Sequence, residues 1–154
     1  MIFLDTHVVV WLYAGELDRI VPSARQRIED QDLLISPVVI LELQFLREIG
    51  RLKVEAHVIV SALAKIVGLQ VCELAFNQVI LEALIQDWTR DPFDRMIVAH
   101  AAARNLPLLT KDDTILAHYR KAFWDTHKNP KQKLKKRVSH AKPRRTRRGE
   151  IIHG

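Results

Sequence analysis

The stretch MIFLDTHVVVWLYAG, residues 1–15, decides the fold class. Its first four residues form a short apolar run that predicts a buried strand, and residues 6–14 predict a helix that Gly15 ends. Asp5 lies at the corner between the two elements. The same alternation of short apolar runs and longer helical segments continues to residue 123. Alternation of this kind predicts an α/β fold with a parallel central sheet and helices on both faces.

The apolar runs predict a sheet of four to five strands, the clearest at residues 1–4, 32–36, 69–74 and 107–109. The helical segments are expected at residues 6–14, 22–30, 37–49, 55–67, 77–88, 92–105 and 113–123. Three of these helices begin with a proline, a residue that the first helical turn accepts because no amide proton is needed there. Ser36 and Asp91 each precede such a proline and are predicted caps, and Asn77 is predicted to cap a further helix.

Composition favours a single domain. The chain has 154 residues, 48% of them hydrophobic, which suffices for a core of its own. No apolar stretch approaches the roughly 18–20 residues of a membrane-spanning helix, and the first residues lack the basic start of a signal peptide. Cys72, the single cysteine, excludes an intrachain disulfide and a zinc site with several thiolates, and we expect it to be buried. These features predict a cytoplasmic protein without a membrane segment.

The formal net charge of +6 is unevenly distributed. Residues 1–124 contain 13 Lys and Arg against 16 Asp and Glu, a charge of −3, whereas residues 125–154 contain 11 against 2, a charge of +9. We therefore divide the chain into a folded domain, residues 1–124, and a basic tail, residues 125–154. The tail is too polar to offset its ordering entropy and is predicted to be disordered when free. Two roles stay open for it: binding to RNA phosphates, or none beyond being solvated.

Four acidic residues stand beside the predicted apolar runs at separate corners of the fold: Asp5, Glu42, Asp94 and Asp112. An ionised carboxylate next to a core-forming run is costly unless it is paired or bound to a metal ion. Ligands of parallel α/β sheets bind beyond the carboxyl ends of the strands, where Asp5 and Asp112 are expected. If the helices of Glu42 and Asp94 begin at the same edge, all four carboxylates converge. Hard oxygen ligands of this kind suit Mg²⁺ or Mn²⁺.

A carboxylate-bound divalent ion can polarise a phosphoryl oxygen and activate water, so neither a nucleophilic side chain nor a basic histidine is required. The chemistry that fits this acidic set is metal-dependent hydrolysis of phosphodiester bonds.

Four segments of the chain resemble, in order and in spacing, the motifs of the PIN domain family. They are Leu4-Asp5-Thr6-His7, Ser36-Pro37 leading to Glu42, Asp91-Pro92-Phe93-Asp94-Arg95, and Leu108-Leu109-Thr110-Lys111-Asp112. The resemblance extends over residues 1–124, and the subgroup most similar to this sequence is the VapC toxins of bacterial toxin–antitoxin pairs. It implies a PIN-like three-layer α/β/α fold, a Mg²⁺-dependent endoribonuclease that cleaves RNA, a homodimer, and a VapB-type antitoxin that keeps the toxin inactive. The basic tail departs from the subgroup, which usually stops near a residue like Trp124.

The resemblance also assigns roles to single residues. Asp5, Glu42 and Asp94 match the core acidic triad of the family, and Asp112 matches its more variable fourth acid. Two hydroxyl positions that steady the metal ligands correspond to Thr6 and Thr110. The resemblance thus implies that the four acids are catalytic and bind the cofactor Mg²⁺, with Mn²⁺ as an alternative.

Several of these residues have structural interpretations as well. Asp5 could cap the first helix, and Asp91 is explained by capping, with an outer role at the metal site left open. Either Asp112 or its neighbour Asp113 could be the fourth acid, the other one capping the last helix. Arg95 could pair with a carboxylate or touch RNA phosphate. Packing is the expected role of two histidines and three tryptophans: His7, His100, Trp11, Trp88 and Trp124.

Two other functions compete with the nuclease hypothesis. One is a catalytically silent RNA- or protein-binding module that keeps the fold and uses the basic tail. The other is a phosphatase of the haloacid dehalogenase type, which needs a second aspartate two residues after the first; this chain has His7 there, so that hypothesis is poor.

Overall fold

The computed structural model describes residues 1–125. Predictions about the structure of the basic tail therefore fall on residues 126–154, outside the described residues.

Five parallel strands form one sheet in the order β3-β2-β1-β4-β5. The strands are β1 (Ile2–Leu4), β2 (Leu33–Ile35), β3 (Gln70–Val71), β4 (Leu108–Leu109) and β5 (Ala122–Phe123). β1 is central, and its Phe3 pairs with Leu34 of β2 and with Leu108 of β4. Every residue of β1 and β2 is buried, as expected for strands that are covered on both faces. The predicted parallel sheet of four to five strands is confirmed.

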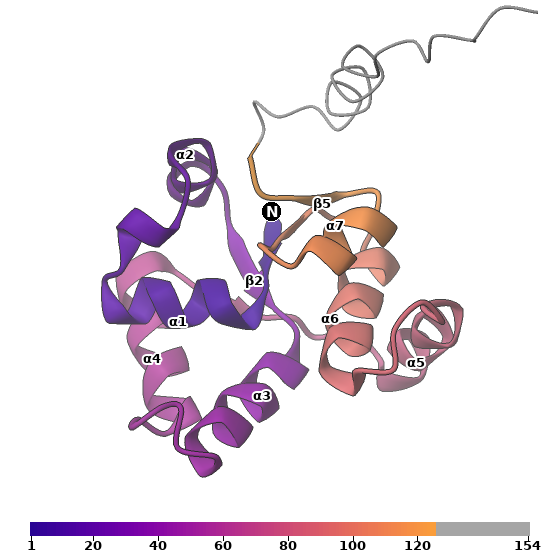
Figure 1. Ribbon diagram of the computed structural model, residues 1–154, viewed down its shortest axis with the longest axis horizontal. Coiled ribbons are helices and arrows are strands. Elements are labelled where there is room, and N and C mark those ends of the chain that lie inside the picture. Colours follow the sequence, from indigo (N-terminus) through magenta and orange to yellow (C-terminus); the bar gives the residue numbers. More distant parts are fainter. Residues whose placement is uncertain (126–154) are drawn as a thin grey trace, which may run out of the picture.

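Helices cover both faces of this sheet. The helices of the described residues are α1 (Thr6–Ala14), the 3₁₀ helix η1 (Leu17–Arg19), α2 (Pro22–Asp30), α3 (Pro37–Glu48), α4 (Ala56–Val67), α5 (Phe76–Ile85), α6 (Pro92–Ala103) and α7 (Asp113–His118). From β1 to β3, each new strand is added on the same side of the one before it. From β3 to β5, the chain moves across the sheet in the opposite direction. Right-handed crossovers then put α1, α2 and α4 on one face and α5, α6 and α7 on the opposite face. Figure 1 shows these two groups on the left and right of the sheet, so the predicted three-layer α/β/α fold is confirmed.

The predicted starts of α3 and α6 are confirmed by their capping hydrogen bonds. Ser36 Oγ accepts from the Val38 amide at 3.3 Å. Asp91 Oδ1 accepts from the amides of Phe93 and Asp94 at 2.8 and 3.0 Å. Each cap satisfies amide groups that have no partner within the first helical turn. The beginnings of the helices that carry Glu42 and Asp94 are therefore fixed by local sequence.

The segment after Asp113 differs from the prediction of one helix to residue 123. α7 ends at His118, and Ala122 and Phe123 form β5 beside β4. The Leu108 amide donates to the Lys121 carbonyl at 3.2 Å, and the Thr110 amide donates to the Phe123 carbonyl at 3.1 Å. A helix continued to residue 123 would have left the edge of β4 without these partners, which is why pairing prevails over the helical pattern.

Smaller differences occur in the preceding segments. The third strand spans only Gln70–Val71, and α5 ends at Ile85 instead of continuing to residue 88. Asn77 lies inside α5, whose N-cap is Ala75, so the predicted cap at Asn77 is wrong.

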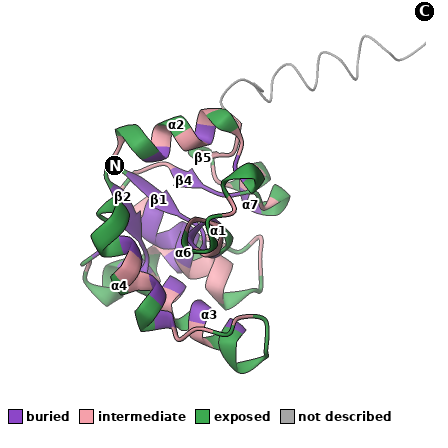
Figure 2. Cartoon of the chain, turned by 90° about the vertical axis from the view of Figure 1, so that its left-hand side faces the viewer, coloured by how far each residue is buried: buried purple, intermediate pink, exposed green. Residues whose placement is uncertain are grey.

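The core lies on both sides of the central strands, which Figure 2 shows in purple between helices with exposed outer surfaces. Ile2, Phe3 and Leu4 are completely buried, and so are Leu108 and Leu109 of the adjacent strand. Cys72 is buried as predicted. Within residues 1–125, no helix combines the length and the apolar character that crossing a membrane requires.

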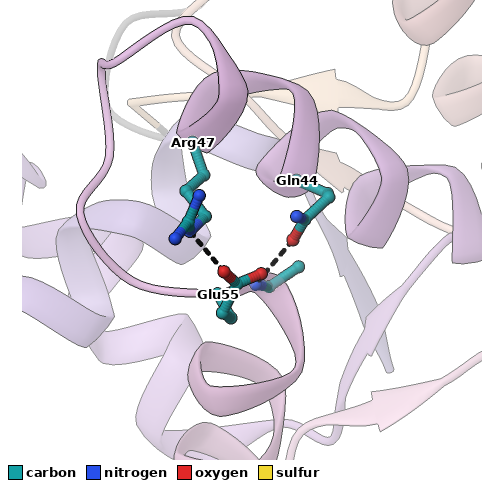
Figure 3. Close-up of polar contacts among 4 residues, drawn as sticks. Gln44, Arg47 and Glu55 are labelled. Carbon is teal, nitrogen blue, oxygen red and sulfur yellow. Dashed lines mark hydrogen bonds and ion pairs between the residues drawn. The ribbon is translucent and has the colours of Figure 1, made fainter.

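The turn from α3 to α4 is held by polar contacts between the two helices (Figure 3). Gln44 Oε1 accepts from the Ala56 amide at 3.3 Å and so caps α4 with a side chain of α3. Arg47 forms an ion pair with Glu55 across the same turn. These contacts support the part of α3 that follows Glu42.

Candidate functional site

The candidate site lies where the connections of the sheet change direction. After β1 the chain continues to β2, which lies on one side of β1 in the sheet. The strand on the other side of β1 is β4, and the chain enters it only after β3. In open α/β sheets, the crevice beyond the carboxyl ends of two such strands is the usual ligand site. Asp5 directly follows β1, and Thr110 directly follows β4. The fold therefore brings together two residues that are 105 positions apart.

The Thr110 hydroxyl joins the two strand ends. It donates to Asp5 Oδ2 at 2.6 Å and accepts from the Asp112 amide at 3.0 Å. The other carboxylate oxygen of Asp5, Oδ1, accepts from the Thr6 amide at 2.7 Å, so the predicted capping role of Asp5 is also present. These bonds fix the orientation of the Asp5 carboxylate. Thr110 thus occupies the steadying position that the PIN resemblance implied for it.

Asp5 is buried, with 5% of its surface exposed. Burial raises the pKa of its carboxyl above the usual value, and the charge of Asp112 raises it further. The hydrogen bonds from Thr110 and Thr6 and the positive charge of His7 act in the opposite direction, but burial dominates. Asp5 therefore ionises at a cost, which a nearby cation would remove.

Glu42 lies half-buried in the second turn of α3. Burial raises the pKa of its carboxyl, and the charges of Asp5 and Asp91 add to this effect. The Thr6 hydroxyl, which has no hydrogen-bond partner of ordinary geometry, lowers the pKa of Glu42. The charge of Asp5 thus acts on Glu42, although the two residues belong to different elements.

Asp94 lies in the first turn of α6, and its carboxyl group also has a raised pKa. Burial, followed by the charges of Asp91, Asp5, Asp112 and Glu42, raises its pKa from 3.8 to about 7. The negative charges of these acids therefore oppose the ionisation of Asp94. The convergence of Asp5, Glu42, Asp94 and Asp112 around one ion stays a prediction. Asp91, which caps α6, adds a fifth negative charge.

Asp112 and Asp113 have different environments. Asp112 Oδ1 caps α7 by accepting from the amides of Thr114 and Ile115 at 2.8 and 2.9 Å. Its charge also raises the pKa of both Asp5 and Asp94. Asp113 is exposed in the first turn of α7. Asp112 thus combines the cap with a position in the acidic cluster.

We asked whether these side chains suit a divalent metal ion. Within residues 1–125, no three His, Cys, Asp or Glu side chains are close enough together to hold an ion as they stand. The chemistry of the donors nevertheless fits, because they are hard carboxylate oxygens whose mutual repulsion a cation would relieve. A buried hydroxyl without a hydrogen-bond partner, that of Thr6, lies beside them. The residues therefore fit Mg²⁺ or Mn²⁺, provided that the half-buried side chains of Glu42 and Asp94 close on Asp5.

His7 was expected to be a packing residue, and its ring lies 6.2 Å from that of Trp11. Its side chain is exposed, and its positive charge lowers the pKa of both Asp5 and Glu42. The sequence signal for this position was its place two residues after Asp5, in the first turn of the following helix.

Among residues 1–125, the side chain of Arg95 forms no ion pair with a carboxylate. Its Nε donates to the Ala83 carbonyl at 2.7 Å, and Nη2 donates to the Leu84 carbonyl at 3.5 Å. Arg95 therefore satisfies carbonyl groups at the end of α5, a role that the sequence analysis missed.

The family of this fold follows from a comparison with known domains. The family model described as "PIN domain" matches residues 2–122, which include all four predicted acids. This chain belongs to the PIN domain family. Among curated proteins, none matches this PIN domain chain.

Solved structures of low sequence identity share the fold of this PIN domain. The chain is similar to one in VapBC2 from Rickettsia felis bound to a promoter DNA fragment, with a TM-score of 0.59, 19% identity, and coverage of 81% of this chain and 100% of that chain. A toxin–antitoxin complex from Klebsiella pneumoniae gives a TM-score of 0.57 and 16% identity, covering 80% of this chain and 96% of that chain. DNA-bound VapBC from Salmonella typhimurium gives 0.51 and 18%, with coverage of 79% and 93%. At such identities, these likenesses establish the fold alone.

Proposed function

We propose that this PIN domain protein is a metal-dependent endoribonuclease, with Mg²⁺ as its cofactor and Mn²⁺ as a substitute. The observation that carries the proposal is that burial and neighbouring acidic charges raise the pKa values of Asp5, Glu42 and Asp94. A cluster of acids with raised pKa values in a crevice is a typical functional site. Structural stability alone would favour neutral residues at these positions, because the charges repel one another.

The residues of the cluster would divide the work by their environments. Asp5, held by Thr110 and by the Thr6 amide, provides a fixed carboxylate at the base of the site. Glu42 and Asp94, which are half-buried, present carboxylates toward solvent, where a phosphodiester can approach. Asp112 adds negative charge, while its Oδ1 accepts a hydrogen bond at the N-terminus of α7. A bound divalent cation supplies Lewis acidity toward the phosphoryl group and favours ionisation of these acids.

The biological role that we propose is that of a cytoplasmic toxin of the VapC type. Three of the solved structures that share its fold are described as VapBC or toxin–antitoxin complexes. By analogy with them, the partners would be RNA as substrate, a VapB-like antitoxin and a second copy of this chain in a homodimer.

The decisive experiment is cleavage of total RNA by purified protein with Mg²⁺, with Mn²⁺ and with EDTA. We expect cleavage with either ion, none with EDTA, and none by Glu42→Gln under any condition. Glu42→Gln keeps the size of the side chain and is the matched control against a contaminating nuclease. Cleavage that persists in EDTA, or at the wild-type rate in Glu42→Gln, would refute the proposal.

The alternative of a catalytically silent binding module makes a different prediction for the same samples. Wild-type protein would then bind RNA without cutting it, and a Mn²⁺ titration by calorimetry would give no heat of binding.

A further inference from the structure

Helices α3 and α6, which carry Glu42 and Asp94, pack against each other in opposite chain directions. Ser36, at the start of α3, contacts His100 in the third turn of α6. Further along α3, the ring of Phe45 lies 5.6 Å from that of Phe93, at the start of α6. Glu42 and Asp94 lie between these two contacts, and the charge of Glu42 acts on Asp94. The two contacts therefore bracket the pair of acids.

The contact between Ser36 and His100 is a buried hydrogen bond. Ser36 Oγ and His100 Nδ1 are 3.0 Å apart, and the two residues are 1% and 4% exposed. Among the described residues, it is the only side-chain hydrogen bond that joins α6 to α3 or its cap. Apolar packing tolerates small shifts, whereas a hydrogen bond weakens steeply when its distance or angle changes. This bond thus adds a directional element to a helix contact that also includes the ring pair of Phe45 and Phe93.

His100 is a poor choice for stability alone. Its second ring nitrogen, Nε2, is buried without a hydrogen-bond partner. A buried polar group left unpaired costs about 1–3 kcal/mol, a cost that an aliphatic side chain of similar size would avoid. Burial and the charge of Arg104 also lower the pKa of the imidazole, which keeps it neutral near pH 7. The imidazole therefore has a role that offsets this cost.

The spacing along the helices indicates what that role is. Glu42 is six residues after Ser36, and Asp94 is six residues before His100. At 1.5 Å per residue, each acid lies about 9 Å along its helix from the hydrogen bond. A shift of α3 along α6 would move Glu42 away from the level of Asp94 by the same amount. The hydrogen bond opposes such a shift.

We propose that His100 is a positioning residue, whose hydrogen bond to Ser36 sets the register of α3 against α6 and so keeps Glu42 and Asp94 at the same level, from which their side chains can close on a shared divalent cation. This inference rests on the proposed function, because it concerns the affinity of the acidic cluster for metal.

The test compares two substitutions of His100 in the full chain. In His100→Asn the side-chain amide occupies the position of Nδ1 and can still bond to Ser36, whereas in His100→Gln the amide lies toward Nε2 and the bond is lost. Val79→Ala is the matched control, because Val79 packs α5 against the other side of α6, beside Ala99. Calorimetric Mn²⁺ titration gives the dissociation constant, and thermal unfolding in EDTA gives the loss of stability.

We expect His100→Gln to weaken Mn²⁺ binding about tenfold or more, the usual effect of losing a group that orients metal ligands. His100→Asn should remain close to wild type. Val79→Ala should lower the melting temperature without changing the Mn²⁺ affinity. Wild-type affinity in His100→Gln, or equal weakening in His100→Asn and His100→Gln, would overturn the inference. Absence of Mn²⁺ binding by the wild type would instead refute the proposed function.

If His100→Gln does not fold, Ser36→Gly provides the same test from the other partner. Glycine is tolerated at a helix N-cap at a cost of a few tenths of a kcal/mol, so α3 still begins at Pro37 while the bond to His100 is lost. The expected result is again weaker Mn²⁺ binding, and unchanged binding would contradict the inference.

Discussion

At the scale of single residues, Thr110 makes two hydrogen bonds with one hydroxyl group. It donates to Asp5 and accepts from the Asp112 amide, and all of its surface is buried. Thr110→Val keeps the shape of the side chain but leaves both partners unpaired. Buried polar groups without partners cost about 1–3 kcal/mol, so we expect the melting temperature to fall by several degrees. Calorimetric melting in EDTA measures this.

Thr110→Ser is the matched variant, because it retains the hydroxyl and removes only a methyl group. It should melt closer to wild type than Thr110→Val does. Equal melting temperatures of Thr110→Val and the wild type would show that this hydroxyl does not support the strand ends.

The pH dependence of stability should reflect Asp94. Its pKa in the folded chain is raised from 3.8 to about 7, mainly by burial. The folded state therefore binds this proton more tightly than the unfolded state, and ionisation destabilises the fold. The penalty is absent below pH about 3.8, increases as the pH rises and is complete above pH about 7. Metal-free protein should consequently melt at a lower temperature at pH 8 than at pH 5.

Asp94→Asn removes that penalty and should melt above wild type at pH 8 in EDTA, with a smaller difference at pH 5. RNA cleavage by this variant should be lost even though its fold is more stable. Asp113→Asn, at an exposed neighbour of Asp112, serves as the control and should change neither property. A lower melting temperature for Asp94→Asn at pH 8 would contradict the raised pKa.

At the scale of elements, Arg95 joins the start of α6 to the end of α5 through the carbonyls of Ala83 and Leu84. Cations near the last turn of a helix also interact favourably with its dipole. Hydrogen bonds to charged groups contribute about 1.5–3 kcal/mol. Arg95→Met should therefore lower the melting temperature but leave the affinity for RNA unchanged at fixed salt concentration.

Lys65→Met is a suitable control for the loss of one positive charge, because Lys65 is exposed on α4. If Arg95→Met weakened RNA binding and left stability unchanged, a phosphate contact would explain Arg95 better than the helix contact.

The starts of α3 and α6 depend on residues adjacent in the chain, whereas the last strand depends on a partner distant in the chain. Ser36 and Asp91 cap their helices through neighbouring amides, so the local sequence was enough to predict them. The segment of Ala122 and Phe123 has a helical pattern, but its backbone pairs with β4, a partner that is distant until the chain folds. Local pattern cannot reveal such pairing, and the helix prediction failed there for this reason.

At the scale of the whole molecule, charge is divided between a domain of −3 and a tail of +9. The affinity of a protein for RNA falls with salt in proportion to the number of phosphates that its cations neutralise. If the tail binds RNA, deletion of residues 128–154 should reduce the slope of log affinity against log salt concentration. Fluorescence anisotropy with a labelled RNA, in EDTA to prevent cleavage, measures the slope for the full chain and for the shortened chain. A strongly salt-dependent affinity that survives the deletion would exclude the tail.

The sequence by itself determined the parallel α/β fold, most helix starts and the four acids, because these features depend on apolar periodicity and on residues adjacent in the chain. Only the tertiary structure decided what those acids experience. The raised pKa of Asp94 needs burial and charges from three other segments besides its own cap Asp91, and the fixed carboxylate of Asp5 needs a hydroxyl 105 residues away. The hydrogen bond between Ser36 and His100 likewise exists only once α3 and α6 pack together. Burial and long-range contacts arise only in the folded chain, and they distinguish a candidate site from four acids that are separate in the sequence.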